Sequence, residues 1–152
     1  MEVSIVKKGA LKLIGMSIHT LLQDVGTKAP GLVAGFEGRK HEIINLRPPY
    51  MEYAVSIDPP NYNDATDEFK LLLGMEVDYF KEVPRGMEAL ELPATAYATT
   101  PKKDDSTFGA LYRWVNDSPD YEMAGLYSLE QTDPENDSVI LMFPVRQIGT
   151  QA

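Results

Sequence analysis

The residue types that could carry chemistry in this chain favour carboxylates and aromatic rings over nucleophiles. The 152 residues include no cysteine and only two histidines. Neither His19 nor His41 has a carboxylate or a second histidine at a metal-ligand spacing such as H-E-x-x-H. No G-x-S-x-G nucleophile elbow and no phosphate-cradling glycine loop occurs. We therefore expect no metal, no cofactor and no covalent nucleophile. Any catalysis would come from a glutamate and tyrosines that act on water.

The net charge bears on the class of partner. Lys and Arg number 14 against 23 Asp and Glu, which gives a formal charge of −9. Affinity for nucleic acid comes mostly from basic side chains that neutralise phosphates, and the sequence has no run of five basic residues. Direct binding to nucleic acid is therefore not expected. The surplus of acid favours cationic ligands or basic protein partners, although it also serves solubility alone.

The sequence predicts neither export nor a membrane. The N-terminus has no long apolar core after a basic segment, and no apolar stretch approaches the about 20 residues that a bilayer requires. The absence of cysteine suits a reducing compartment. We therefore expect a cytoplasmic protein that does not contact a membrane.

The first half of the chain predicts the order strand, helix, strand, strand. The strands are expected at residues 10–19, 50–57 and 68–80, where apolar side chains alternate with others. Thr27 offers an N-cap, Pro30 suits the first turn, and the helix is expected to end before Pro48. Proline and asparagine make residues 58–64 a loop.

The second half predicts the same order of elements. Its strands are expected at residues 88–99, 121–130 and 138–146. Pro93 interrupts the first of these, which indicates an edge or bulged strand. Residues 104–106 supply N-cap candidates, and the helix after them has an apolar stripe formed by Phe108, Leu111, Tyr112 and Val115.

These two halves predict an α+β fold in one domain spanning residues 1–152. The repeat covers approximately residues 10–80 and 87–146, each half forming a β-α-β-β unit. Two such units would form an antiparallel sheet with both helices on one face. The other face would then be concave and uncovered, and a groove of that kind is a natural ligand site.

Several spaced motifs in the second half occur in a recognisable order. They lie at residues 74–78, 83–88, 92–94, 97–98, 114–118, 121, 129–130 and 143–145. Together they resemble the signature of GyrI-like domains, which are also the effector-binding modules of bacterial transcription activators. The resemblance implies a duplicated fold that binds bulky, often cationic or aromatic compounds. It also implies two activities of relatives, namely hydrolysis of cyclopropane-containing toxins and protection of DNA gyrase by protein contact.

The same resemblance places the pocket carboxylate at Glu130. A carboxylate among aromatic walls is desolvated, and it would either pair with a cationic ligand or act as a general base. Without such walls, Glu130 would be a solvated side chain before a polar turn. In the hydrolase alternative, Glu130 would activate water while Tyr97 or Tyr112 donates a proton.

The candidate pocket walls are aromatic, and each could instead belong to the core. They are Tyr53, Tyr97, Tyr112, Trp114 and Tyr121. Tyr97 alternates with small alanines, which favours the pocket, whereas Tyr112 lies on a helical apolar stripe, which favours the core. The leading hypothesis is a stand-alone domain that binds bulky aromatic or cationic compounds. The alternatives are the hydrolase and an acidic protein-partner module that shields gyrase.

Overall fold

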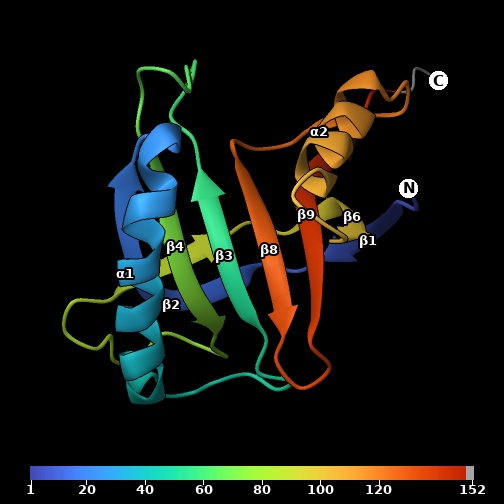
Figure 1. Cartoon of the computed structure of the whole chain (residues 1–152). Coiled ribbons are helices and arrows are strands. Elements are labelled where there is room, and N and C mark those ends of the chain that lie inside the picture. Colours follow the sequence, from blue (N-terminus) through green and yellow to red (C-terminus); the bar gives the residue numbers. More distant parts are fainter. Residues whose placement is uncertain (150–152) are drawn as a thin grey trace.

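The computed structural model describes residues 1–149 and contains one antiparallel sheet of nine strands (Figure 1). The sheet order is β1-β6-β9-β8-β3-β4-β2-β5, with β7 paired to β9. The strands are β1 Ser4–Lys8, β2 Leu11–Thr20, β3 Glu52–Ile57, β4 Phe69–Glu76, β5 Glu88–Leu92, β6 Thr95–Pro101, β7 Tyr121–Met123, β8 Tyr127–Asp133 and β9 Ser138–Gln147. The helices are α1 Val25–Arg39 and α2 Thr107–Asp117, and short 3-10 turns cover Leu22–Asp24 and Lys40–Glu42.

The expected duplication is present in the order of elements. The first unit is β2-α1-β3-β4, and the second is β6-α2-β8-β9 with the short β7 inserted. The two units join where β3 pairs with β8, and Ser56 lies opposite Ser128 in that register. The α+β class, the antiparallel sheet and the two helices on one face are confirmed.

Several boundaries differ from the sequence prediction. The segment 88–99 forms two strands, because the chain leaves the ladder around Pro93; β5 lies at the sheet edge, as a proline-ended strand should. Residues 121–130 divide into β7 and β8 around Gly125. Strand β1, which pairs with β6, was not predicted. Its side chains show no regular alternation, so periodicity alone could not reveal it.

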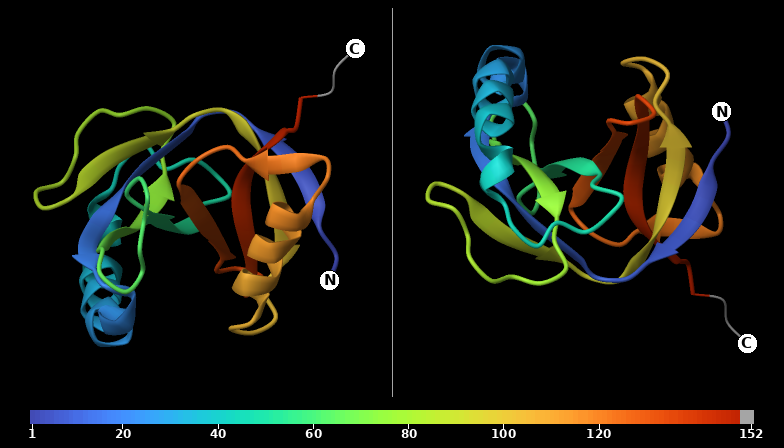
Figure 2. Two further views of the ribbon diagram at one scale, coloured as in Figure 1. Left: turned by 90° about the horizontal axis from the view of Figure 1, so that it is seen from above. Right: turned by 90° about the horizontal axis from the view of Figure 1, so that it is seen from below.

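Each helix packs on its own half of the same sheet face. Phe36 of α1 packs with Ile14 and Met75 of the strands beneath it. Leu111 and Val115 of α2 pack with a second apolar cluster that includes Phe143 of β9. The helices thus stand apart over the two flanks of the sheet, with β3 and β8 between them (Figures 1 and 2). Within residues 1–149, neither helix is long and apolar enough to cross a membrane.

The opposite face of the sheet is filled rather than hollow. The strands β1, β2, β5 and β6 curve around that side (Figure 2). Side chains of β2, β5 and β6 pack there against those of β3, β4, β8 and β9 and form the main core cluster. Its buried members are Leu11, Leu13, Tyr53, Val55, Leu72, Leu92, Tyr97, Leu129 and Met142. The groove that we expected on this face is therefore replaced by packed core, and the hollow of the molecule lies on the helix side.

Candidate ligand-binding site

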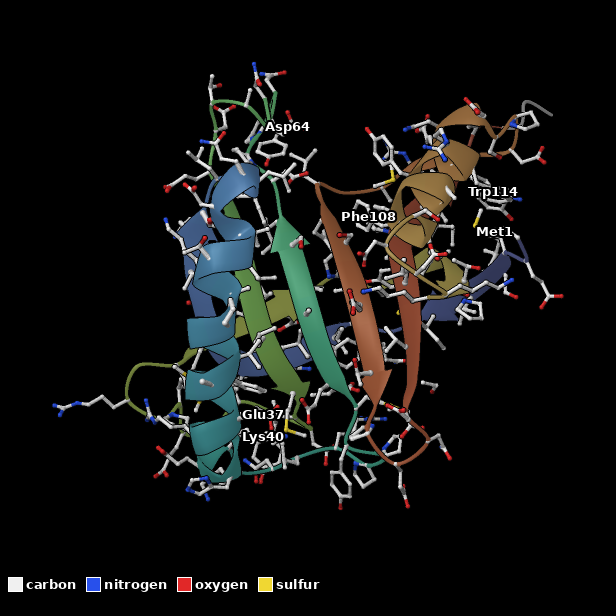
Figure 3. The ribbon with its side chains drawn as sticks, viewed as in Figure 1. Met1, Glu37, Lys40, Asp64, Phe108 and Trp114 are labelled. Carbon is white, nitrogen blue, oxygen red and sulfur yellow. The ribbon has the colours of Figure 1, made fainter. Side chains whose placement is uncertain are left out.

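A cavity of about 720 Å³ opens on the helix side, at the end of the sheet where β3 leads into the loop 58–68. Its floor includes Ser56 of β3 and Ser128 of β8, which face each other in the ladder. One wall comes from α2, and another comes from the loop 58–68 with Phe69 at the start of β4. Figure 3 labels one residue from each side, Phe108 on α2 and Asp64 in the loop. The volume suits a small organic molecule.

Aromatic rings form both walls of this cavity. On the α2 side, the ring centroids of Phe108 and Tyr112 lie 5.1 Å and 5.9 Å from that of Phe143. On the loop side, Tyr62 and Phe69 meet edge to face at 6.4 Å. These are the separations and tilts that aromatic pairs prefer, so each wall is a packed cluster rather than a set of loose side chains.

The helical stripe of α2 explains how these rings reach the cavity. Leu111 and Val115 are buried against the sheet, whereas Phe108 and Tyr112 keep 47% and 48% of their surface exposed. Residues at i, i+3 and i+4 share a helix face, but that face is wider than the contact with the sheet. The sequence prediction of a core stripe is therefore half right: two of its four side chains pack, and two form a cavity wall.

A carboxylate that sequence reasoning missed also lines the cavity. Asp58 follows β3 directly, and its backbone N–H donates to the carbonyl of Leu126 at 2.8 Å. The carboxylate forms no ion pair or side-chain hydrogen bond with the described residues, and burial raises its pKa above the ordinary value. The sequence could have indicated this position, because Asp58 lies two residues after Ser56 and side chains two apart on a strand point to the same face.

Behind the cavity, a tyrosine pair connects the lining to the core. Tyr127 lines the cavity, and its hydroxyl oxygen lies 3.0 Å from that of Tyr97. Tyr97 is buried in the main core cluster, and burial is the first cause that raises the pKa of both phenols. Tyr97 therefore stands one layer behind the wall, on the face opposite the helices, and does not line the cavity itself.

The remaining sequence candidates lie outside the cavity. Tyr53 is buried in the main core, where its hydroxyl accepts a hydrogen bond from Nε2 of Gln131 at 2.8 Å. Trp114 stacks on Tyr121 with the ring centroids 6.5 Å apart, beside the α2 cluster. Of the six side chains proposed from the sequence, Tyr112 is the one that lines this cavity.

Glu130 does not occupy the buried position that we expected. It lies on the helix side of β8, since the preceding Leu129 packs into the core on the other side. Its side chain is 37% exposed, and its Oε1 lies 3.4 Å from Nζ of Lys102. The expectation that Glu130 sits beneath rings is wrong. Tyr97 points to the opposite face, so the Glu130–Tyr97 pair of the hydrolase hypothesis is not assembled.

The duplicated fold and the helix-side cavity are the features expected of an effector-binding domain. The family model for integron-associated effector binding proteins, Cass2, matches residues 4–145. The chain belongs to this family, which lies within the GyrI-like superfamily. The resemblance seen in the sequence is thereby confirmed.

Known relatives agree with this assignment. The transcriptional regulator BrlR of Pseudomonas aeruginosa is 31% identical over 123 residues, covering 74% of this chain and 41% of the regulator. The chain thus spans less than half of that relative. The structure of SAV2435 bound to tetraphenylphosphonium has a TM-score of 0.74 at 10% identity, covering 96% of this chain and 94% of the other. EcmrR in an EcmrR–DNA complex has a TM-score of 0.64 at 13% identity, covering 97% of this chain and 58% of the other. At such identities, these two structures show the shared fold alone.

Proposed function

We propose that this chain binds bulky aromatic or cationic organic compounds in the helix-side cavity. The observation that carries the proposal is the pair Phe108 and Tyr112, each about half exposed over a cavity of about 720 Å³ and each backed by Phe143. A monomer that exposes two neighbouring rings in a hollow leaves apolar surface that a ligand can cover. Each Å² of apolar surface covered contributes about 25 cal/mol.

The packing of the walls favours binding without large rearrangement. Phe108 and Tyr112 rest on a buried ring, and Tyr62 rests on Phe69, so the two walls are preformed. A preformed site costs less conformational entropy on binding than one that must order its side chains. The tetraphenylphosphonium bound to SAV2435 is a bulky compound of this class, and it supports the proposal by analogy of fold.

The other candidate residues take supporting positions in this proposal. Tyr97 holds the cavity wall through its contact with Tyr127. Tyr53, Trp114 and Tyr121 stabilise the sheet and the α2 cluster on which the walls stand. Glu130 is an outer acid, two positions along β8 from Ser128 on the same face, and it attracts cations from outside the cavity.

The similarity to BrlR supports an effector-sensing role for this binding. BrlR is a transcriptional regulator, and the matched segment covers 41% of it. We propose that the segment shared with this chain is the part that recognises a compound. Binding is favoured over hydrolysis, because the base and one of the two proposed acids, Glu130 and Tyr97, lie on opposite faces of the sheet.

Isothermal titration with tetraphenylphosphonium tests the proposed function. We expect saturable binding of one molecule per chain, and Tyr112→Ala should weaken it about tenfold, which corresponds to about 1.4 kcal/mol. The matched control is Tyr79→Ala, because Tyr79 is 54% exposed but lies outside the cavity. Absence of saturable binding by the wild type would refute the proposal, as would an equal loss in both variants.

A further inference from the structure

We propose that Asp58 is the charge-selecting residue of this cavity, and that its carboxylate makes the cavity prefer monovalent lipophilic cations over anions of the same shape. The inference rests on the proposed function and names a group that contacts the ligand directly. Three features carry it: the backbone register that orients Asp58, the absence of a counter-charge, and the rings on both sides.

The backbone fixes the direction of the Asp58 side chain. The β3–β8 register pairs Ser56 with Ser128 and Ile57 with Tyr127. The hydrogen bond from the Asp58 N–H to the Leu126 carbonyl continues this register by one residue. Successive side chains of a strand point to opposite faces, so Asp58 points to the same face as Ser56, which is the cavity floor. The following Pro59 has no N–H and cannot extend the ladder, so Asp58 is its last member.

No positive group of the described chain neutralises this carboxylate. Among the described residues 1–149, those that line the cavity include Asp58 and Asp64 but no lysine, arginine or histidine. The Asp58 carboxylate has no hydrogen-bond or ion-pair partner among them, and burial raises its pKa. A partly buried carboxylate without a partner is unfavourable, and a bound cation would relieve that cost. Asp58 is therefore a partly buried acidic group with no partner among the described residues, and a cationic ligand would supply one.

The surrounding rings determine which kind of cation fits. Tyr62 and Phe69 lie on the loop side, and Phe108 and Tyr112 lie on the α2 side. Aromatic faces attract cations, and they do so most effectively when water is excluded. A metal ion requires several oxygen ligands, whereas this cavity offers two carboxylates, of which Asp64 is exposed. A weakly hydrated organic cation with its charge spread under apolar groups matches both the carboxylate and the rings.

The other acids near the site differ from Asp58 in a way that the experiment can use. Glu130 already pairs with Lys102 and does not line the cavity. Asp64 lines the rim but is exposed, so water screens its charge. Replacing either residue by its amide removes one negative charge, just as Asp58→Asn does. They are therefore matched controls for long-range attraction by the total charge of −9.

The experiment compares tetraphenylphosphonium with tetraphenylborate, which has the same shape and the opposite charge, by titration in sodium buffers. We expect the wild type to prefer the cation, and Asp58→Asn to lose about tenfold of its affinity for the cation without weakening the anion. Glu130→Gln and Asp64→Asn should each change cation affinity less than about threefold. Tyr112→Ala should weaken both probes, because its ring covers the apolar groups that the two probes share.

The outcomes separate this inference from the proposed function. If the wild type binds neither probe, the proposed function fails and the inference fails with it. If it binds but Asp58→Asn retains wild-type cation affinity, or weakens both probes equally, the inference alone is overturned. A thermal melt checks that the variant folds. Should it not fold, the wild-type cation preference is measured in about 1 M salt, where long-range attraction is screened. A cation preference that persists in this salt supports a carboxylate inside the cavity. A cation preference that vanishes overturns the inference about Asp58.

Discussion

The hydroxyl oxygens of Tyr97 and Tyr127 lie 3.0 Å apart, and this contact joins the buried core to the lining of the cavity. Their rings meet edge to face with centroids 6.4 Å apart. The Tyr127 ring also lies close to Gly125, where an added Cβ would come within 2.7 Å of the ring carbon Cε1. The position of Tyr127 is therefore constrained by both Tyr97 and Gly125.

Tyr97→Phe tests the first of these constraints. The change leaves the partly buried Tyr127 hydroxyl without its partner, which should lower the free energy of unfolding by about 1 kcal/mol. Urea denaturation measures this difference. The double variant Tyr97→Phe with Tyr127→Phe should recover part of the loss, because both polar groups are then gone. A double variant that is destabilised by the plain sum of the two single changes would contradict a direct interaction.

Gly125→Ala tests the second constraint. The new methyl group overlaps the Tyr127 ring, so the ring must move toward the cavity or the segment before β8 must shift. We expect the affinity for tetraphenylphosphonium to fall several-fold, as measured by titration. Gly9→Ala is the control, because a Cβ at Gly9 meets nothing within 4 Å. Unchanged affinity in Gly125→Ala would show that this wall of the cavity does not contact the ligand.

Gly15 lies where a neighbouring strand leaves no room for a side chain. It lies opposite Gly74 in the β2–β4 ladder, and a Cβ there would come within 1.9 Å of the Leu73 carbonyl oxygen. Because backbone cannot move aside as a side chain can, we expect Gly15→Ala to destabilise the protein by about 3 kcal/mol or more. Gly38 in α1 has open space around it, and Gly38→Ala should stabilise the helix by about 0.5–1 kcal/mol. Chemical denaturation of both variants checks the opposite signs.

The sequence predicted the order of elements well, because period-two and helical patterns report which residues face the interior. The strand 50–57 and the helix after residues 104–106 were located within two or three residues. The repeat is visible in the order of helices and strands rather than in sequence identity between the halves, and this order led to the right fold class. Periodicity, however, assigns a residue to a face without saying what covers that face. The sheet curls, so the face expected to be hollow became the main core, and Tyr53 and Tyr97 went with it.

The site was predicted less well, for reasons that particular residues make clear. Glu130 was chosen from a resemblance, but its surroundings depend on Lys102, which is 28 residues away in sequence. Asp58 was read as part of a loop, because Pro59 and Pro60 follow it. Its role depends on a hydrogen bond to Leu126, a contact between the two halves that no local pattern reveals. Tyr112, whose helical stripe favoured the core, lines the helix-side cavity.

The pH dependence of stability offers an independent test of the state of Asp58. Burial raises the pKa of Asp58 in the folded protein above its ordinary value of 3.8, so the folded state binds this proton more tightly than the unfolded state. The contribution of Asp58 to the free energy of unfolding therefore falls as the pH rises from that ordinary value through the folded pKa. Asp58→Asn removes this loss, and the variant should gain stability relative to the wild type across that window.

The comparison with the variant is needed because other groups titrate in the same range. Among the cavity groups, Asp64 is the second carboxylate, while burial raises the pKa of Tyr62 and of Tyr127 further above this range. Elsewhere, burial also raises the pKa of Glu76, whereas hydrogen bonds and ion pairs lower the pKa of Asp104 and Glu42. Urea denaturation of both proteins from about pH 3.5 to about pH 7 isolates Asp58 as a difference. Cation affinity should decline over the same window as the pH falls, because protonation removes the charge that the ligand pairs with. Parallel stability profiles for the wild type and Asp58→Asn would show that the carboxylate is solvated like any surface aspartate.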